Sequence, residues 1–241
     1  MSAPRRRILI LSGLIAALAL VVWGVPVYLA GRAEAAAPTC LTHDGAGDRC
    51  RIDGGPLEMS GAPVFVEKFD HAFMATSQSI SFTDARGEVW VVPDRTLTDG
   101  ASIPTIFEPL IGDRQSRSFL EAAALHDAYC GVGNEALETY QTRHWADVHR
   151  MFYEALIVSG TPPQRAKTMF AAVYLGGPRW DDPARDLSGV STEALIKEME
   201  WCSEWINATE PTIEEVEAWM KDREAALLDG TSTRPSFLDE G

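Results

Sequence analysis

The stretch FLEAAALHDAYC, at residues 119–130, decides the fold class of this chain. Before it, short apolar stretches alternate with turn residues, whereas within it apolar side chains recur at three- and four-residue spacing. The recurring residues are Phe119, Ala122, Ala123, His126 and Cys130. This period is typical of one face of a helix, so His126 is expected on an apolar helix face.

The chain before this helix predicts strands. Residues 64–66, 79–83 and 88–92 are short, β-branched or aromatic stretches, separated by turn residues such as Gly87. Such stretches are typical of a small antiparallel sheet.

The chain after this helix predicts further helices, at residues 142–159, 165–175, 191–205 and 212–228. Thr212 followed by Glu215 forms the pattern of a capping box, and the last ten or so residues are expected to be disordered. The fold class is therefore α+β, with a small antiparallel sheet packed on a core of about three helices and a C-terminal helical extension.

The N-terminus predicts a membrane segment. Arg5, Arg6 and Arg7 precede an almost uninterrupted apolar run at residues 8–30, which is long enough to span a bilayer as a helix. The arginines place the N-terminus in the cytoplasm and the folded part on the periplasmic or extracellular side of the inner or cytoplasmic membrane. The run is longer than a usual signal peptide, which favours a retained anchor, although the small residues at 33–37 leave cleavage open.

Four regions follow from this composition. Residues 1–32 are the cytoplasmic stub and anchor, 33–61 a linker with a disulfide loop, 62–182 the α+β domain, and 183–241 an acidic helical extension. The net charge of −14 argues against a nucleic-acid partner, so the membrane is the one partner that the sequence indicates.

All four cysteines follow the apolar run, and an even number in an oxidising compartment favours disulfides. Of the three possible connectivities, Cys40 with Cys50 and Cys130 with Cys202 is preferred, with free buried thiols as the alternative. No CxxC pair or Cys/His cluster of zinc spacing occurs, so the sequence gives little support to a structural zinc site.

Two neighbouring helices carry residues capable of chemistry. His126 and Asp127 are adjacent and followed by Tyr129, while His144 and Asp147 lie three residues apart on the next helix. If the helices are antiparallel, a carboxylate could orient a histidine that activates water, or the group could hold a divalent metal. The alternative is structural, because a lone histidine on an apolar helix face is usually a hydrogen-bonded core residue.

The loop Thr98-Asp99-Gly100-Ala101-Ser102-Ile103-Pro104 joins sheet and helices. Asp99 and Ser102 are candidate site residues there, because such loops commonly carry function; a helix-capping turn is the alternative. The chain has no phosphate-binding glycine loop, Gly-x-Ser-x-Gly elbow or His-Glu-x-x-His pair, which excludes those enzyme classes.

The order of these motifs resembles an uncharacterised family of phages and bacteria, domain of unknown function 1353. The resemblance covers residues 64–180 and implies no established activity. The matching positions are Asp99, Gly100, Ser102, Pro104, His126, Asp127, Tyr129, Asp147 and Trp180. His144, the cysteines, the leader and the acidic extension lie outside the pattern.

The His-Asp pair is also similar to the phospholipase A2 site. That resemblance implies that His126 deprotonates water, Asp147 orients its imidazole, and Asp127 binds a divalent cation such as calcium. Asp99 is the second expected metal ligand. The glycine-rich calcium loop of phospholipase A2 is absent in its usual form.

Two functions follow as expectations. The first is a membrane-anchored hydrolase acting on an ester or polymer of the cell envelope, with Asp99, Ser102, His126, Asp127 and Asp147 around its pocket. The second is a non-catalytic envelope or phage-derived module in which the His/Asp cluster is a buried hydrogen-bond network. Exposure separates the two, because a catalytic site needs a pocket that opens onto these groups.

Overall fold

The computed structural model of the chain describes residues 40, 50–67, 69, 71–100, 104–111 and 119–239. These residues form an α+β fold, as the sequence predicts. The apolar run at 8–30 and Ser102 lie outside the described residues. Among the residues that are described, no helix is both long and apolar enough to cross a membrane.

The strands form two antiparallel sheets, each of three strands, where the sequence predicts one sheet. In the first, β4 (Ile80–Thr83) lies between β1 (Arg51–Asp53) and β5 (Val89–Val92). In the second, β3 (Ala72–Thr76) lies between β2 (Met59–Phe65) and β6 (Leu97–Thr98). The segments 79–83 and 88–92 correspond to β4 and β5, and 64–66 overlaps only the end of β2.

The helices follow the sheets in sequence. They are α2 (Glu108–Ile111), α3 (Leu120–Cys130), α4 (Trp145–Val158), α5 (Pro163–Gly176), α6 (Thr192–Thr209) and α7 (Ile213–Leu228). Short 3-10 helices occur at Thr105–Phe107, Pro183–Arg185 and Ser236–Asp239. Each of the predicted long helices is therefore present, within a few residues of its predicted ends.

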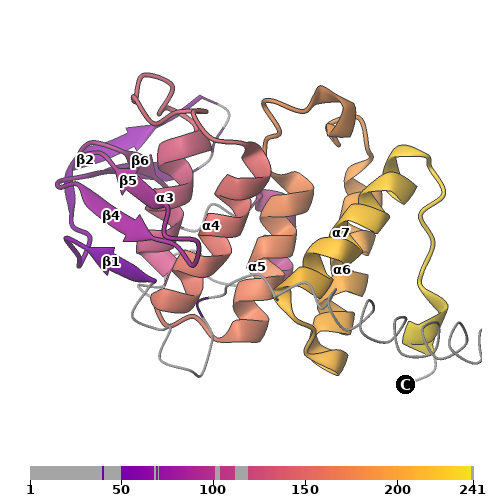
Figure 1. The fold of residues 1–241 in the computed structure, drawn as a ribbon. Coiled ribbons are helices and arrows are strands. Elements are labelled where there is room, and N and C mark those ends of the chain that lie inside the picture. The colour runs from indigo at the N-terminus through magenta and orange to yellow at the C-terminus, as the bar shows by residue number, and fades with distance from the viewer. Residues whose placement is uncertain are drawn as a thin grey trace, which may run out of the picture. The chain divides into compact units, whose positions relative to one another are not determined.

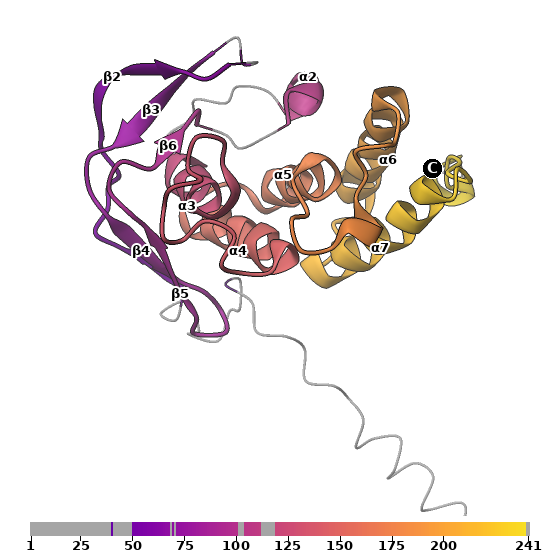
Figure 2. The same ribbon diagram turned by 90° about the horizontal axis from the view of Figure 1, so that it is seen from above.

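Within residues 38–241 the elements lie in successive layers (Figures 1 and 2). The sheets pack on α3 and α4, α5 lies against α4, and α6 and α7 cover the other side of α5. Nearly all of α3 from Ala122 to Cys130 is buried, as expected for a helix enclosed on several sides. This enclosure buries His126, which decides what its imidazole can do.

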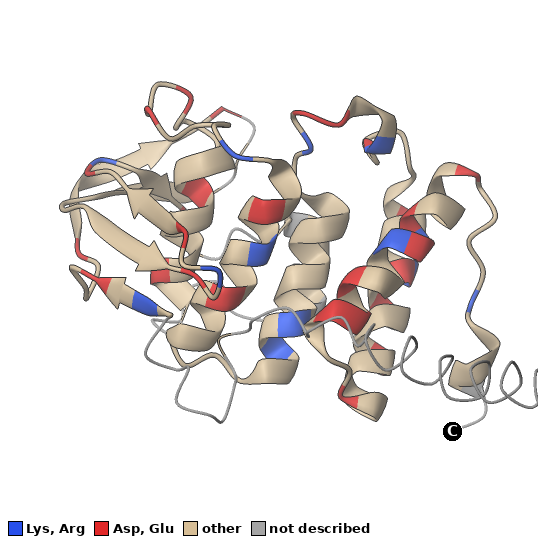
Figure 3. Cartoon of the chain, in the orientation of Figure 1, with Lys and Arg blue, Asp and Glu red and all other residues tan. Residues whose placement is uncertain are grey.

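The C-terminal extension is part of this packing. The predicted capping box at Thr212 and Glu215 is present at the start of α7. Acidic residues outnumber basic ones on α6 and α7 (Figure 3). Within the described part of the C-terminal segment, Arg234 pairs with Glu204 at 2.9 Å and Phe237 packs edge-on against Trp219.

One of the two predicted disulfides is present. Cys40 and Cys50 form a disulfide, which agrees with the preferred pairing. Cys130 and Cys202 are separate buried thiols, so their predicted bridge is wrong. The physical reason is their helical placement: Cys130 ends α3 beside His126, whereas Cys202 lies on α6 with its sulfur 3.5 Å from that of Met220.

Candidate functional site

A polar pocket lies between α4 and the turn that joins β4 to β5. Its cavity volume is about 240 Å³. The residues that line it are Asp84, Arg86, Glu88, Trp90, Arg143, Asp147, Arg150, Met151 and Glu154. Seven of these nine carry a charge, which is unusual for a cavity that only fills a packing gap.

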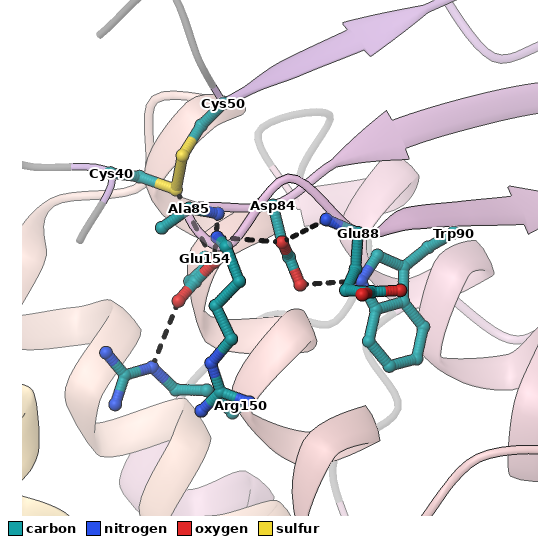
Figure 4. The surroundings of a disulfide bond; sticks show 9 residues. Cys40, Cys50, Asp84, Ala85, Glu88, Trp90, Arg150 and Glu154 are labelled. Carbon is teal, nitrogen blue, oxygen red and sulfur yellow. Dashed lines mark hydrogen bonds and ion pairs between the residues drawn. A yellow bond between two sulfur atoms is a disulfide. The ribbon is translucent and has the colours of Figure 1, made fainter. Parts of the chain in front are cut away.

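The floor of the pocket begins with Asp84, which is buried in the β4–β5 turn. Its carboxylate accepts hydrogen bonds from the backbone N–H of Arg86 at 2.9 Å and of Glu88 at 2.8 Å, and from the indole N–H of Trp90 at 2.9 Å (Figure 4). An aspartate that bonds backbone N–H groups shortly after itself is typical of a tight turn. Asp84 therefore fixes both the turn and the Trp90 ring that faces the pocket.

Glu154 of α4 completes the floor beside the disulfide (Figure 4). Its Oε2 accepts from the backbone N–H of Ala85 at 3.0 Å, and its Oε1 from Arg150 Nε at 3.2 Å. Burial raises the pKa of the Glu154 carboxyl, while the Ala85 and Arg150 contacts act in the opposite direction. The result is a buried carboxyl that takes up a proton more readily than an exposed one.

The rim of the pocket consists of exposed ion pairs. Arg86 contacts Asp147 at 3.1 Å, and their side chains are 54% and 49% exposed. Arg143 contacts Glu88 at 3.3 Å and also lies 5.2 Å from the centroid of the Trp90 ring. Exposed pairs of this kind stabilise a fold by about 0–1 kcal/mol, so a ligand can replace them at little cost.

His126 lies elsewhere, in the interface between α3 and α4. His126 is only 4% exposed, and its ring centroid is 5.2 Å from the ring centroids of both His149 and Phe152. The Sγ of Cys130 is 3.4 Å from its Nε2, and Asp127 Oδ1 is 3.8 Å from its Nδ1. The expected His126–Asp147 pair does not form, because Asp147 contacts Arg86 at the exposed pocket rim.

The two buried histidines have opposite electrostatics. Burial lowers the pKa of His126, but the neighbouring Cys130 and Asp127 raise it to about 10. The pKa of His149 lies well below its usual value because of burial, the neighbouring His126 and the positive charge of Arg179. The surroundings therefore shift the pKa values of the two imidazoles in opposite directions.

The expected calcium ligands are not brought together in the part of the chain that is described. Asp99 Oδ2 lies 2.9 Å from His71 Nε2, and the ring of His71 packs near Phe69 and Phe73. Among the described residues, no group with metal-ligand spacing contains Asp99 or Asp127. The expected pair of calcium ligands is therefore not observed there.

The remaining predicted residues connect elements of the fold. His144 is the N-cap of α4 and its Nδ1 accepts from the Ala146 N–H at 3.2 Å. The hydroxyl of Tyr129 accepts from the Val91 N–H at 3.1 Å, which ties α3 to β5. Trp180 Nε1 donates to the carbonyl of Arg143 at 3.0 Å. These contacts give His144, Tyr129 and Trp180 a structural role that needs no catalysis.

Sequence reasoning missed several residues that the structure places at the two sites. Arg86 and Glu154 gave no motif, because an arginine in a turn and a glutamate in a helix are common. His149 had a signal: it follows Trp145 by four residues and precedes Phe152 by three, so these three residues share one helix face. The same spacing argument that marked His126 could have found it.

Comparisons with known proteins confirm the family resemblance. Residues 74–173 match the model of a family described as "Protein of unknown function (DUF1353)". "Uncharacterized protein y4iH" of Sinorhizobium fredii (strain NBRC 101917 / NGR234) is 37% identical over 99 residues, which are 41% of this chain and 38% of that protein. "Uncharacterized protein y4jT" of the same strain is 34% identical over 126 residues, 52% of this chain and 35% of that protein.

The chain thus matches little more than a third of the length of these two relatives. No solved structure matches the chain. The relatives and the family carry no described activity, and no comparison supports the phospholipase A2 resemblance.

Proposed function

We propose that this chain is an envelope-binding module that holds a unit of a cell-envelope polymer in the pocket between α4 and the β4–β5 turn. The ligand class is a group that carries both carboxylate and ammonium charges, such as the peptide portion of a cell-wall glycan. The observation that carries the proposal is the pocket's construction, with exchangeable ion pairs at the rim above buried charges at the floor.

The rim offers both signs of charge within one small cavity. Arg86 and Arg143 can each bind a carboxylate of the ligand, while Asp147 and Glu88 can each bind an ammonium group. The Trp90 ring adds an apolar face, and ring faces of this kind pack well against flat or cyclic groups. A singly charged ligand would leave half of these groups without a new partner.

The enclosure of His126 supports binding at this pocket over hydrolysis at the predicted dyad. Its imidazole contacts His149, Phe152 and Cys130, and a general base needs access to the water that it activates. The environment of His126 therefore agrees better with the non-catalytic module, in which a buried polar cluster joins two helices, than with the hydrolase.

An envelope location is part of the proposal. The apolar run at 8–30 is long enough for an anchor, and the Cys40–Cys50 disulfide agrees with an oxidising compartment. The expected measurement is that alkaline extraction leaves the chain in the membrane fraction and that external protease degrades it in spheroplasts. Release of the intact chain by alkali would remove the anchor from the proposal.

The binding test uses the full chain in detergent and soluble peptidoglycan fragments that retain their peptides. Isothermal titration should show saturable binding, and both Asp147→Asn and Arg143→Ala should weaken it by about tenfold or more, as expected for loss of a charged contact. Glu193→Gln is the matched control, because its ion pair with Lys197 is exposed on α6. No binding by the wild type, or equal binding by Asp147→Asn, would overturn the proposal.

A second candidate function is hydrolysis of the bound polymer by two carboxyls of α4. Asp147 and Glu154 are seven residues apart, about two helical turns, so both reach the same pocket. Burial raises the pKa of Glu154, whereas Asp147 is exposed, and such a contrast is typical of an acid and a base in glycoside hydrolysis.

In this reaction Glu154 donates its proton to the leaving oxygen, and Asp147 takes a proton from the water whose oxygen bonds to the sugar carbon. Incubation with the same fragments should then release new reducing ends. Glu154→Gln should abolish that release while binding persists. Binding without any release by the wild type would leave the chain a binding module and exclude this candidate.

A further inference from the structure

We propose that His126, Cys130 and His149 form a buried site for a zinc-class transition-metal ion between α3 and α4. This site is independent of the polar pocket, because it shares no side chain with the pocket lining. It also differs from the calcium site that the sequence suggests, since its donors are two imidazole nitrogens and a thiolate.

The ligand spacing comes from the helices themselves. His126 and Cys130 are four residues apart on α3, which places them on one face, and His149 of α4 faces them across the interface. One ligand atom from each residue lies within 4.8 Å of the others. Three donors from two packed helices therefore converge on one point.

The individual distances agree with a shared ion. In a tetrahedral zinc site the bonds are about 2.1 Å to nitrogen and about 2.3 Å to sulfur, so a nitrogen and a sulfur bound to the same ion are about 3.6 Å apart. The Cys130 sulfur is 3.4 Å from His126 Nε2 and 3.7 Å from Nδ1. Two imidazoles on one such ion have centroids about 5.3 Å apart, and those of His126 and His149 are 5.2 Å apart.

A second observation points to a missing ligand. His149 is fully buried, and neither of its ring nitrogens has a hydrogen-bond partner within the described part of the chain. Buried polar atoms in folded proteins nearly always have a partner, and an imidazole without one is costly. A bound metal ion would satisfy one of these nitrogens directly.

The surroundings suit the charge of such a site. Asp127 Oδ1 lies 3.8 Å from His126 Nδ1. In many metal sites a carboxylate lies near the ring nitrogen of the histidine that does not bind the metal, and it orients the imidazole. Arg179 is the cation near His149, and its charge is balanced by Glu224 at 2.8 Å. Zinc binding would form bonds to the Cys130 sulfur and to the imidazole nitrogens, and it would release to solvent the one proton that the Cys130–His126 pair holds.

The donor set selects the metal class. Thiolate and imidazole ligands favour zinc and related transition metals, whereas calcium and magnesium prefer oxygen ligands. Three protein ligands leave a fourth position for water or another donor. Burial of all three residues indicates a structural ion that joins α3 to α4.

The test is titration of the metal-free full chain with cobalt(II) under anaerobic conditions, using cobalt as a spectroscopic substitute for zinc. The expected result is one equivalent bound, with the intense visible bands of tetrahedral cobalt and a thiolate-to-cobalt charge-transfer band, both lost when zinc is added. Cys130→Ser should remove the charge-transfer band, and His149→Gln should weaken binding by at least about tenfold.

Cys202→Ser is the matched control, because Cys202 is also a buried thiol but contacts Met220 on the far side of α5. It should bind cobalt as the wild type does. Circular dichroism of each variant reports whether it has folded, and the wild-type titration decides the question without any variant. No charge-transfer band in the wild type, or its persistence in Cys130→Ser, would overturn the site.

Discussion

At the scale of single residues, Glu224 shows how charge is held inside the helical layers. Its carboxylate pairs with Arg179 at 2.8 Å and with Arg185 at 2.5 Å, and its side chain is only 4% exposed. Burial raises the pKa of Glu224, but the hydrogen bond from Arg185 and the two positive charges outweigh burial, so its pKa lies below the usual value. One α7 side chain thereby fixes the segment that follows α5.

Glu224→Gln is predicted to lower the free energy of unfolding by about 3 kcal/mol, because it leaves two arginines without their carboxylate. Urea denaturation at pH 7 measures this loss. Glu193→Gln, an exposed glutamate on α6, should leave the urea midpoint unchanged. An equal midpoint for Glu224→Gln and wild type would show that the arginines find other partners.

The same residue predicts a pH dependence. A carboxyl with a lowered folded-state pKa contributes stability above its unfolded value of 4.5, and this contribution is lost as pH falls below that value. Thermal unfolding should therefore show a smaller difference between wild type and Glu224→Gln at pH 3 than at pH 7. A difference that grows on acidification would contradict the assigned direction of the shift.

Tyr129 is the residue of the His-Asp-x-Tyr motif whose role the structure makes clearest. Its hydroxyl accepts from the Val91 N–H, and its ring meets Trp90 edge-on at 5.1 Å. Tyr129→Phe keeps the ring and removes the acceptor, so it should cost about 1 kcal/mol of unfolding free energy in urea denaturation. A loss of ligand binding without a loss of stability would instead place Tyr129 in the site.

Prediction from sequence was uneven at this scale. The apolar spacing placed His126 on a buried face, but spacing along one helix says nothing about which residue of another helix lies opposite. Asp147 and His149 are two residues apart, about 200° around a helix, so only one of them could face His126. The structure shows that this residue is His149.

At the scale of elements, the helices and their ends could be predicted because the apolar spacing and the capping residues are local features of the sequence. The capping box of α7 is an example: Glu215 N–H donates to Thr212 Oγ1 at 3.2 Å, and Thr212 N–H donates to Glu215 Oε2 at 2.7 Å. The second sheet could not be predicted from the sequence, because β6 has only two residues and β3, with the sequence AFMAT, shows no alternation of apolar and polar residues. Their pairing depends on distant segments.

Thr212→Ala is predicted to lower stability by about 1 kcal/mol, because the α7 N-terminus loses one half of its capping box. Thermal unfolding of the variant measures the change. Thr212→Ser retains the acceptor oxygen and is the matched control, which should stay close to wild type. Equal losses for both variants would mean that the threonine methyl group, and not the cap, stabilises this end.

At the scale of the whole molecule, the Cys40–Cys50 disulfide joins the start of the folded unit to the floor of the pocket. The sulfur of Cys40 lies 3.6 Å from Glu154 Oε2, which in turn bonds the Ala85 N–H (Figure 4). The bridge closes a short loop, because the two cysteines are ten residues apart. The polar pocket is thereby linked to the first residues of the described fold.

Replacing both cysteines by serine is predicted to lower the free energy of unfolding by about 2–3 kcal/mol, the loop-entropy estimate for a bridge of this length. Urea denaturation of the double variant measures the loss. Reduction of the wild type should reproduce it, whereas reduction of the double variant should change nothing. An unchanged urea midpoint after reduction of the wild type would remove the bridge from the stability of the fold.

The central claim is that the polar pocket binds an envelope ligand that carries both a carboxylate and an ammonium group. Its most direct test is the NMR signal of the Trp90 indole N–H. This group donates to Asp84 in the pocket floor, and it should shift saturably as peptidoglycan fragments are added to the full chain. The indole signals of Trp205 and Trp219, which stack on each other at α6 and α7, should stay in place as internal controls. A fixed Trp90 signal at saturating fragment, or shifts confined to Trp205 and Trp219, would contradict the claim.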